Sequence, residues 1–281
     1  MNKDFKDEKK KWPNGARCAI SFSFDVDIDS SWRLKLKEAG MDENEPVVRS
    51  IGQYGLSRGV PRILALLKKY SIKGTFFVPG IVAREYEDVI IKIKNDGHEI
   101  AHHGFNHVPP TSLTEDEQER EIVDGKKALE DALGVTPIGY RSPGEGMGFA
   151  TLRALVKNGF VYDSSMMGDD IPYLYDIGNG DKIVEIPWKW DVDDFVFYSF
   201  NYYPPLKYKL APPVSPRIVT EIWKDEFDVL YEEGLFFTAI GHPHQIGQPS
   251  RIKALEEFIK YIINKKDVTM ATYGEIAKLF K

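Results

Sequence analysis

The sequence predicts an α/β protein built on a parallel sheet that closes into a barrel. Along most of the 281 residues, apolar stretches with the two-residue period of strands alternate with stretches of helical period. No Gly-x-Gly-x-x-Gly fingerprint appears, which favours a barrel over a dinucleotide-binding sheet. The length suits one large domain or two small ones. Because the chain has no internal repeat and no low-complexity segment, we expect residues 1–281 to form a single domain.

Local patterns predict the elements of the first half. Residues 18–24 alternate as a strand does. Pro61 suits the first turn of a helix. A segment with a capping residue, 112–115, opens a long helix to about Leu133, which Gly134 closes. The other predicted elements are strands at 74–78 and 98–102 and a helix at 82–95.

The second half continues the alternation with one irregular stretch. Residues 163–181 are rich in Asp, Gly and Pro and predict loops. Residues 193–200 suggest a further strand, and prolines at 204–205 and 212–213 interrupt the chain after it. The other predicted elements are strands at 138–140, 160–162, 183–187, 235–240 and 268–270, and helices at 148–159, 215–233, 249–263 and 272–280.

Composition excludes several classes of protein. The net charge of −6 and the lack of a long basic run argue against nucleic-acid binding. No run approaches the ~18 apolar residues of a membrane span. Residues 1–11 are polar and show no apolar core of a signal peptide. We therefore expect a soluble, cytoplasmic protein.

Two carboxylates end the first predicted strand. Because strand side chains alternate, Asp25 and Asp27 share a face at the carboxyl end, where α/β barrels build active sites. Close carboxylates repel each other unless a cation separates their roles, so one would bind a metal ion and the other would act as a base. The alternative is a solvated turn, since Asp29, Ser30 and Ser31 follow directly.

Histidines four residues apart provide the second candidate segment. On a helical turn His103 and His107 would share a face, so both imidazoles could reach one metal ion. The nearby His98 and His102 would hold these ligands in place without binding the metal ion themselves. The alternative is that some of these histidines only pack in the core or lie on the surface.

Arg141 and His242 each follow a predicted strand. An arginine there can hold a catalytic carboxylate ionised, and a histidine there can protonate a departing nitrogen. A turn arginine and a packing histidine are the alternatives. His244 is a weaker candidate for the role of His242, because Pro243 constrains the chain between them.

Acidic and aromatic residues that follow two of the predicted strands indicate a substrate-binding wall of the active site. Asp169, Asp170 and Tyr173 follow the strand at 160–162, and Trp188 with Trp190 follows the strand at 183–187. Carboxylates and aromatic faces suit a polar ring. The alternative is that the aspartates cap a turn and the tryptophans fill the outer layer of the barrel.

Together these segments resemble the polysaccharide deacetylase family, also called carbohydrate esterase family 4 or NodB-like. The matching motifs are residues 23–27 (SFDVD), 103–107 (HGFNH), 141–144 (RSPG), 162–165 (YDSS) and 239–242 (AIGH). The resemblance runs from about residue 16 to the end. It implies a deformed (β/α) barrel of about seven parallel strands and metal-dependent hydrolysis of non-peptide C–N bonds. It also implies roles for six residues: Asp25 as base, Arg141 as its partner, His242 as acid, and Asp27, His103 and His107 as metal ligands.

Departures from the usual motifs bear on the substrate. The sequence departs from the usual motifs at Val26, which lies between the aspartates, at Gly104 and at Gly144. In these departures it resembles a cytoplasmic branch of the family that includes allantoinase-like proteins, cyclic-imide hydrolases and proteins named peptidoglycan deacetylases. The alternatives are therefore an acetylated glycan and a small cyclic imide or ureide, which fits the expected compartment better. Members of this branch tend to be homo-oligomers. For the metal ion we expect zinc, with cobalt, nickel, manganese and iron as alternatives.

An amide hydrolase is thus the leading hypothesis. A non-catalytic binding module is the alternative from another class, but the sequence keeps every acid, base and metal position, and a degenerate protein is expected to lose at least one. No phosphate loop with GK[ST] appears, which argues against phosphoryl transfer.

Overall fold

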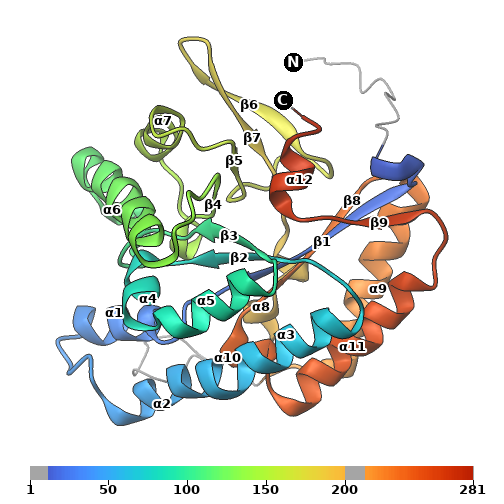
Figure 1. Ribbon diagram of the computed structural model, residues 1–281, viewed down its shortest axis with the longest axis horizontal. Helices are drawn as coiled ribbons and strands as arrows, with labels where there is room; N and C mark the ends of the chain where they lie inside the picture. The colour runs from blue at the N-terminus through green and yellow to red at the C-terminus, as the bar shows by residue number, and fades with distance from the viewer. Residues whose placement is uncertain (1–11, 200–212, 281) are drawn as a thin grey trace.

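A nine-stranded sheet forms the centre of the structure, a computed structural model that describes residues 12–199 and 213–280 (Figure 1). The strand order is β6-β7-β5-β4-β3-β2-β1-β8, with β9 beside β1, and every pairing is parallel except that of β6 with β7. The sheet curls into a partial barrel with helices around it. The strands are β1 (Cys18–Asp25), β2 (Thr75–Val78), β3 (Glu99–His102), β4 (Gly139–Tyr140), β5 (Tyr162–Asp163), β6 (Tyr173–Gly178), β7 (Asp181–Glu185), β8 (Phe236–Gly241) and β9 (Val268–Met270).

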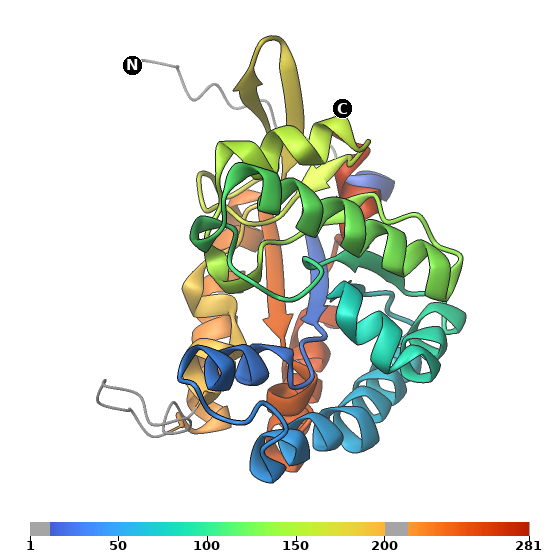
Figure 2. The same ribbon diagram turned by 90° about the vertical axis from the view of Figure 1, so that its left-hand side faces the viewer.

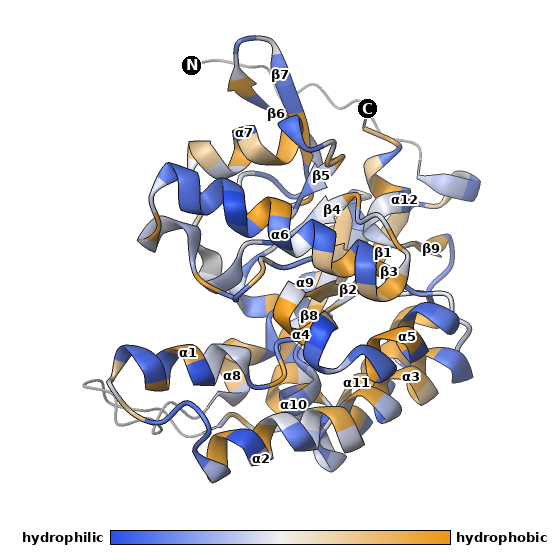
Figure 3. Cartoon of the chain, turned by 60° about the vertical axis from the view of Figure 1, so that its left-hand side comes forward, coloured by the Kyte–Doolittle hydropathy of each residue, from blue (hydrophilic) through white to orange (hydrophobic). Residues whose placement is uncertain are grey.

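Twelve α-helices lie in the described residues, and α6 shows why such segments are helical. Its buried residues recur every three or four positions, so one side packs inward while the other is hydrophilic (Figure 3). None of these helices is both long and apolar enough to cross a membrane. They are α1 (Ser30–Glu38), α2 (Pro46–Tyr54), α3 (Val60–Lys69), α4 (Gly80–Glu85), α5 (Glu87–Asn95), α6 (Glu115–Leu133), α7 (Phe149–Lys157), α8 (Asp194–Tyr198), α9 (Pro216–Glu233), α10 (Pro243–Ile246), α11 (Pro249–Ile263) and α12 (Tyr273–Ala277).

Strand β1 is central and buried along its whole length. Its alternate residues Ile20, Phe22 and Phe24 belong to the large apolar core, which also contains residues of α3, α5, α9 and α11. The opposite face carries small or polar residues and ends at Asp25. The register pairs Asp25 with Phe77 of β2, and Phe24 with Gly241 of β8. The carboxyl ends of these strands therefore lie together at one edge of the sheet, on the side where α1 lies (Figure 2).

Three local expectations are wrong. Within 163–181, predicted as loops, β6 forms a hairpin with β7. The turn between them contains Asn179 and Gly180 at positive φ, which is typical of tight hairpins. In the segment 193–200, the described residues 193–199 do not form a strand: α8 starts at Asp194, and Asp193 alone bridges to Ile240. The segment from His103 to His107 is a loop and not a helical turn, because Gly104 and His107 both have positive φ.

Other differences concern helix boundaries. The sequence did not predict α1 and α2, which follow β1. The helix expected at 82–95 is divided into α4 and α5 at Tyr86, whose backbone leaves the helical region. The prolines at 204–205 and 212 lie outside the described residues.

Candidate metal centre and active site

A cavity of about 300 Å³ lies at the carboxyl ends of β1, β3 and β8. All six residues predicted to bind a metal ion or to take part in catalysis line it: Asp25, Asp27, His103, His107, Arg141 and His242. Each of them is at most 7% exposed. The tertiary structure thus gathers into one cavity residues that lie more than 200 positions apart in the sequence.

The two aspartates reach the cavity because β1 ends in a defined turn. The N–H of Val26 still donates to the carbonyl of Phe77, at 2.9 Å, so pairing with β2 continues one residue beyond Asp25. The backbone N–H and the hydroxyl of Ser30 both donate to the carbonyl of Asp27, at 2.9 and 2.8 Å. This turn opens α1 and fixes the direction of the Asp27 side chain.

The loop of His103 and His107 is held from both sides. The carboxylate of Glu121, on α6, accepts the N–H groups of Phe105 and Asn106 at 2.7 and 2.8 Å. The N–H of Gly80 donates to the carbonyl of Gly104 at 2.9 Å. Glycine is required at 104, because φ is +70° and a Cβ would lie 2.9 Å from Cγ of Pro143.

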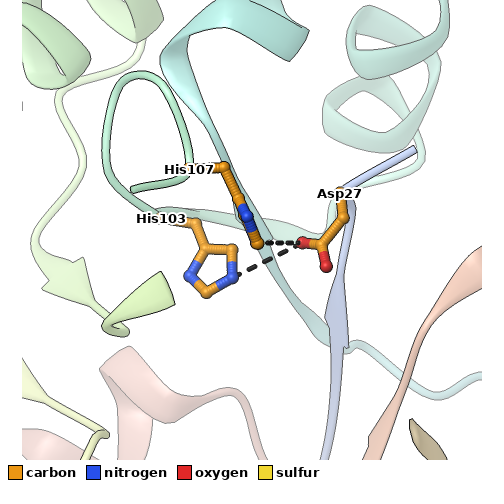
Figure 4. A group of neighbouring side chains, drawn as sticks. All are labelled: Asp27, His103 and His107. Carbon is orange, nitrogen blue, oxygen red and sulfur yellow. Dashed lines mark ion pairs between the residues drawn. The ribbon is translucent and has the colours of Figure 1, made fainter. Parts of the chain in front are cut away.

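Asp27, His103 and His107 form a set of three potential metal ligands (Figure 4). Oδ1 of Asp27 lies 3.4 Å from Nε2 of His103 and 3.2 Å from Nε2 of His107. This oxygen is buried and has no hydrogen-bond partner among the described residues. Burial raises the pKa of Asp27, but the two neighbouring imidazoles outweigh this effect and hold the pKa well below its usual range.

The orientation of His103 also suits a metal ligand. Its Nδ1 lies 2.8 Å from the backbone carbonyl of Arg141, which requires a proton on Nδ1 and leaves Nε2 facing Asp27. A carboxylate oxygen without a partner and two imidazole nitrogens that converge on it are a donor set that suits zinc and other divalent transition metals. The residues present therefore fit a divalent cation.

Arg141 fixes Asp25 from the other side of the cavity. Its Nη1 donates to Oδ1 of Asp25 at 2.7 Å, and the guanidinium lies 4.1 Å from the ring centre of Phe77. It also donates to the carbonyl and hydroxyl of Ser164 and to the hydroxyl of Tyr273. A buried arginine with all these partners holds Asp25 in one orientation and leaves Oδ2 of Asp25 toward the histidines.

Behind Arg141 lies a pair of buried carboxyl groups. Glu185 accepts the N–H groups of Ser165 and Met166, and Asp163 accepts the hydroxyl of Ser165. Burial raises the pKa of Asp163 to about 6 and raises that of Glu185 well above its usual range. Through their bonds to Ser165 and Met166, the two carboxyl groups fix the segment that contacts Arg141.

His242 is oriented by an aspartate that the sequence analysis did not select. Nδ1 of His242 lies 2.7 Å from Oδ1 of Asp194, and the backbone N–H of His242 donates to the same carboxylate. Burial lowers the pKa of His242, but Asp194 and Asp193 raise it well above its ordinary value. The signal in the sequence is the adjacent Asp193 and Asp194 after the predicted strand at 183–187, although their segment resembles a further strand at 193–200.

The other histidines do not line the cavity. His102 supports the ligand loop, since its Nδ1 accepts the N–H of Gly104 at 3.0 Å. His98 lies at the opposite end of β3, where it accepts the N–H of Gly74, so its expected support of the metal ligands is wrong. His244 is buried on α10 without a hydrogen-bond partner among the described residues, and its ring centre lies 5.9 Å from that of His242.

Of the predicted substrate wall, only Trp188 lines the cavity. The carbonyl of Asp170 accepts the N–H of Phe236, the first residue of β8, whereas the cavity lies at the other end of that strand, at Ile240 and His242. Asp169 accepts N–H groups of its own loop, and Tyr173 begins β6. The structure thus keeps these three residues away from the cavity, and their predicted contact with the substrate finds no support in this geometry.

The wall that the structure does provide comes largely from elements that the sequence did not predict. Helix α1 contributes four residues, Ser31, Leu34, Lys35 and Glu38. Phe195 of α8 and Ile240 of β8 add apolar surface beside Trp188. The cavity therefore combines a dense group of charged and polar side chains with an apolar wall.

Comparison with known proteins agrees with this geometry. The family model described as polysaccharide deacetylase matches residues 45–162. The crystal structure of a putative polysaccharide deacetylase from Mycobacterium smegmatis is 35% identical in sequence, with 95% of this chain and 91% of that chain covered and a TM-score of 0.86. The chain belongs to the polysaccharide deacetylase family. The shared architecture also confirms the predicted deformed (β/α) barrel.

Other polysaccharide deacetylase relatives carry different names. The peptidoglycan deacetylase of Helicobacter pylori is 28% identical over 291 residues, which cover 93% of this chain and 95% of that protein. The crystal structure of Puue allantoinase is 26% identical, with 96% and 92% of the two chains covered and a TM-score of 0.83. Membership in the family makes this protein a hydrolase of carbon–nitrogen bonds other than peptide bonds.

Proposed function

We propose that the protein is a metal-dependent amide hydrolase. The observation that carries this proposal is the convergence of Asp27, His103 and His107 beside a second carboxylate, Asp25, which is paired with Arg141. When bound by Asp27, His103 and His107, a divalent cation would supply Lewis acidity to the amide carbonyl and to the attacking water.

Asp25 is the proposed base. Arg141 contacts one of its oxygens at 2.7 Å, and the second oxygen lies 3.9 Å from Nε2 of His103 and 4.0 Å from Nε2 of His242. That second oxygen is free to take a proton from water that attacks a carbonyl in the cavity. The pairing with Arg141 holds the carboxylate in one orientation.

His242 is the proposed acid. Its Nε2 lies on the same side of the cavity as the free oxygen of Asp25, and Asp194 holds its Nδ1. With its raised pKa, His242 stays protonated at neutral pH and can give its Nε2 proton to the departing nitrogen. The oxygen of water thus adds to the carbonyl carbon, one of its protons passes to Asp25, and the C–N bond breaks as the nitrogen takes a proton from His242. The carbonyl half becomes a carboxylic acid, and the departing nitrogen becomes an amine or, in an imide or ureide, the nitrogen of an amide or urea group.

Two substrate classes are supported by different observations. The relationship to the peptidoglycan deacetylase of Helicobacter pylori supports removal of an acetyl group from an amino sugar. The likeness to Puue allantoinase and the cavity of about 300 Å³ walled by α1 and Trp188 favour a small cyclic ureide or imide. We propose small amides, including a single acetylated sugar unit, as the first substrates to test.

Metal removal tests the proposal. Purified protein is stripped with a chelator and refilled with zinc, cobalt, nickel, manganese or iron. Turnover of N-acetylglucosamine oligomers, peptidoglycan, allantoin and succinimide is then measured beside the metal content. Activity should vanish on stripping and return with at least one ion. Equal turnover in stripped and refilled protein would contradict the proposal, and tight binding without any turnover would favour a binding module.

A further inference from the structure

Two adjacent buried carboxylates, Asp193 and Asp194, stand beside His242, but their surroundings differ. Asp194 is fully buried, and both of its oxygens accept hydrogen bonds from His242, through the backbone N–H and Nδ1. Each oxygen of Asp194 thus already has a partner in the proposed acid, and Asp194 does not line the cavity. Asp194 therefore has no oxygen left for a ligand.

Asp193 is arranged differently. It is 4% exposed and lines the cavity, and its bridge to Ile240 of β8 fixes its backbone at the cavity wall. Oδ1 accepts the N–H of Phe195 at 2.8 Å and lies 3.6 Å from Nδ1 of His242. Both of these contacts are made by Oδ1, and Oδ2 has neither a hydrogen bond nor an ion pair with any described residue.

Capping of α8 accounts for only one of the two carboxylate oxygens of Asp193. An N-cap needs one acceptor oxygen, which asparagine and serine supply as well. A largely buried carboxylate whose second oxygen has no partner is costly. A hydrogen-bond donor in the cavity would remove that cost.

We propose that Asp193 is a specificity-determining residue whose free oxygen accepts a hydrogen bond from an N–H or O–H group of the substrate. This inference rests on the proposed amide hydrolysis. Because Asp193 lies beside His242, the donor belongs to the half of the substrate that leaves with the nitrogen. The favoured amides are therefore those whose leaving half carries a further donor, such as the second N–H of a ureide or a hydroxyl of an amino sugar. Succinimide carries no such donor.

Matched substrates test this inference in the metal-loaded, full-length enzyme. Hydantoin is compared with 1-methylhydantoin, and N-acetylglucosamine with its 3-O-methyl derivative, because each pair differs by one methylated donor. Wild type should prefer the donor-bearing member. Asp193→Asn keeps the size of the side chain and the capping oxygen but replaces the free acceptor by a donor. It should lower kcat/KM for the donor-bearing member roughly 10–100-fold, mainly through KM, and abolish the preference.

Two further variants make the result decisive. Asp193→Ser also keeps the cap but lacks the second oxygen, so it should lose the preference as well. Asp191→Asn, at a position that does not line the cavity, should keep it. An unchanged preference in both Asp193 variants, or a fall in kcat alone for both members of a pair, would overturn the inference. Wild-type protein that hydrolyses succinimide but neither pair would overturn the inference and leave the proposed function standing, whereas wild-type protein that hydrolyses no amide of the whole panel would refute the proposed function itself.

Discussion

The pairs Asp25/Asp27 and Asp169/Asp170 look alike in the sequence but have different surroundings. Asp25 and Asp27 are 5% and 3% exposed and face Arg141 and the histidines at the carboxyl end of β1. Asp169 caps its own loop, and Asp170, with a side chain 46% exposed, pairs with Lys189 at 2.6 Å near the start of β8. Both pairs are acidic and follow a strand, yet only one reaches the cavity.

This difference shows which surroundings allow a carboxylate to take part in catalysis or metal binding. A buried carboxylate needs a charged or hydrogen-bonding partner, so its environment fixes both its ionisation and its direction. An exposed carboxylate is solvated by water, and its ion pair contributes little. Four substitutions, in order of decreasing expected effect, test this contrast.

Asp27→Ala should have the largest effect. It removes the anionic member of the proposed ligand set, so metal content after dialysis and turnover should both fall to background. Metal content is measured by plasma mass spectrometry, with Asp170→Ala as the acidic control. Full metal occupancy in Asp27→Ala would contradict the ligand assignment.

Asp25→Asn should separate the base from the ligands. The variant should keep its metal, because Asp27, His103 and His107 remain, but kcat should fall by on the order of 10²–10⁴-fold with the loss of the base. Steady-state kinetics and metal analysis on one preparation check both points. If Asp25→Asn emptied the site while Asp27→Ala left it full, the two roles would be reversed.

Asp194→Asn should change the pH profile. Asp194 raises the pKa of His242, and an acid acts only while protonated, so the raised pKa extends activity toward alkaline pH. The variant should lower this pKa and shift the alkaline limb of kcat/KM to lower pH. The accompanying loss should be smaller than the roughly 10²–10⁴-fold contribution of a complete acid step. An alkaline limb at the wild-type position would mean that His242 is not the acid.

Asp170→Ala should have the smallest effect. It removes an exposed ion pair with Lys189, which is worth below about 1 kcal/mol after solvent screening. Metal content and kcat/KM should equal those of wild type, and the melting temperature should change little. A raised KM or an altered substrate preference would instead place this loop at the substrate, for example through an arrangement between subunits.

The sequence predicted the chemistry of the cavity better than its shape. Asp25, Asp27 and His242 lie at or directly after the ends of buried strands, and strand ends are readable from local apolar patterns. His103 and His107 were found for a reason that proved wrong, since their spacing suggested a helical turn and the structure forms a loop held by Glu121. The predicted roles of these residues, the cytoplasmic location and the homo-oligomeric state stay predictions.

What the sequence by itself determined is the alternation of strands and helices over most of the chain, the fold class and the residue types of the site, because these follow from side-chain periodicity and motif spacing over a few residues. Only the tertiary structure decided that Asp194 holds His242 and that α1 walls the cavity. It likewise decided that Asp170 lies near the start of β8 and not at the cavity. These facts depend on how the sheet curls and on where each loop crosses it. Such long-range packing depends on contacts between distant segments, which no local pattern records.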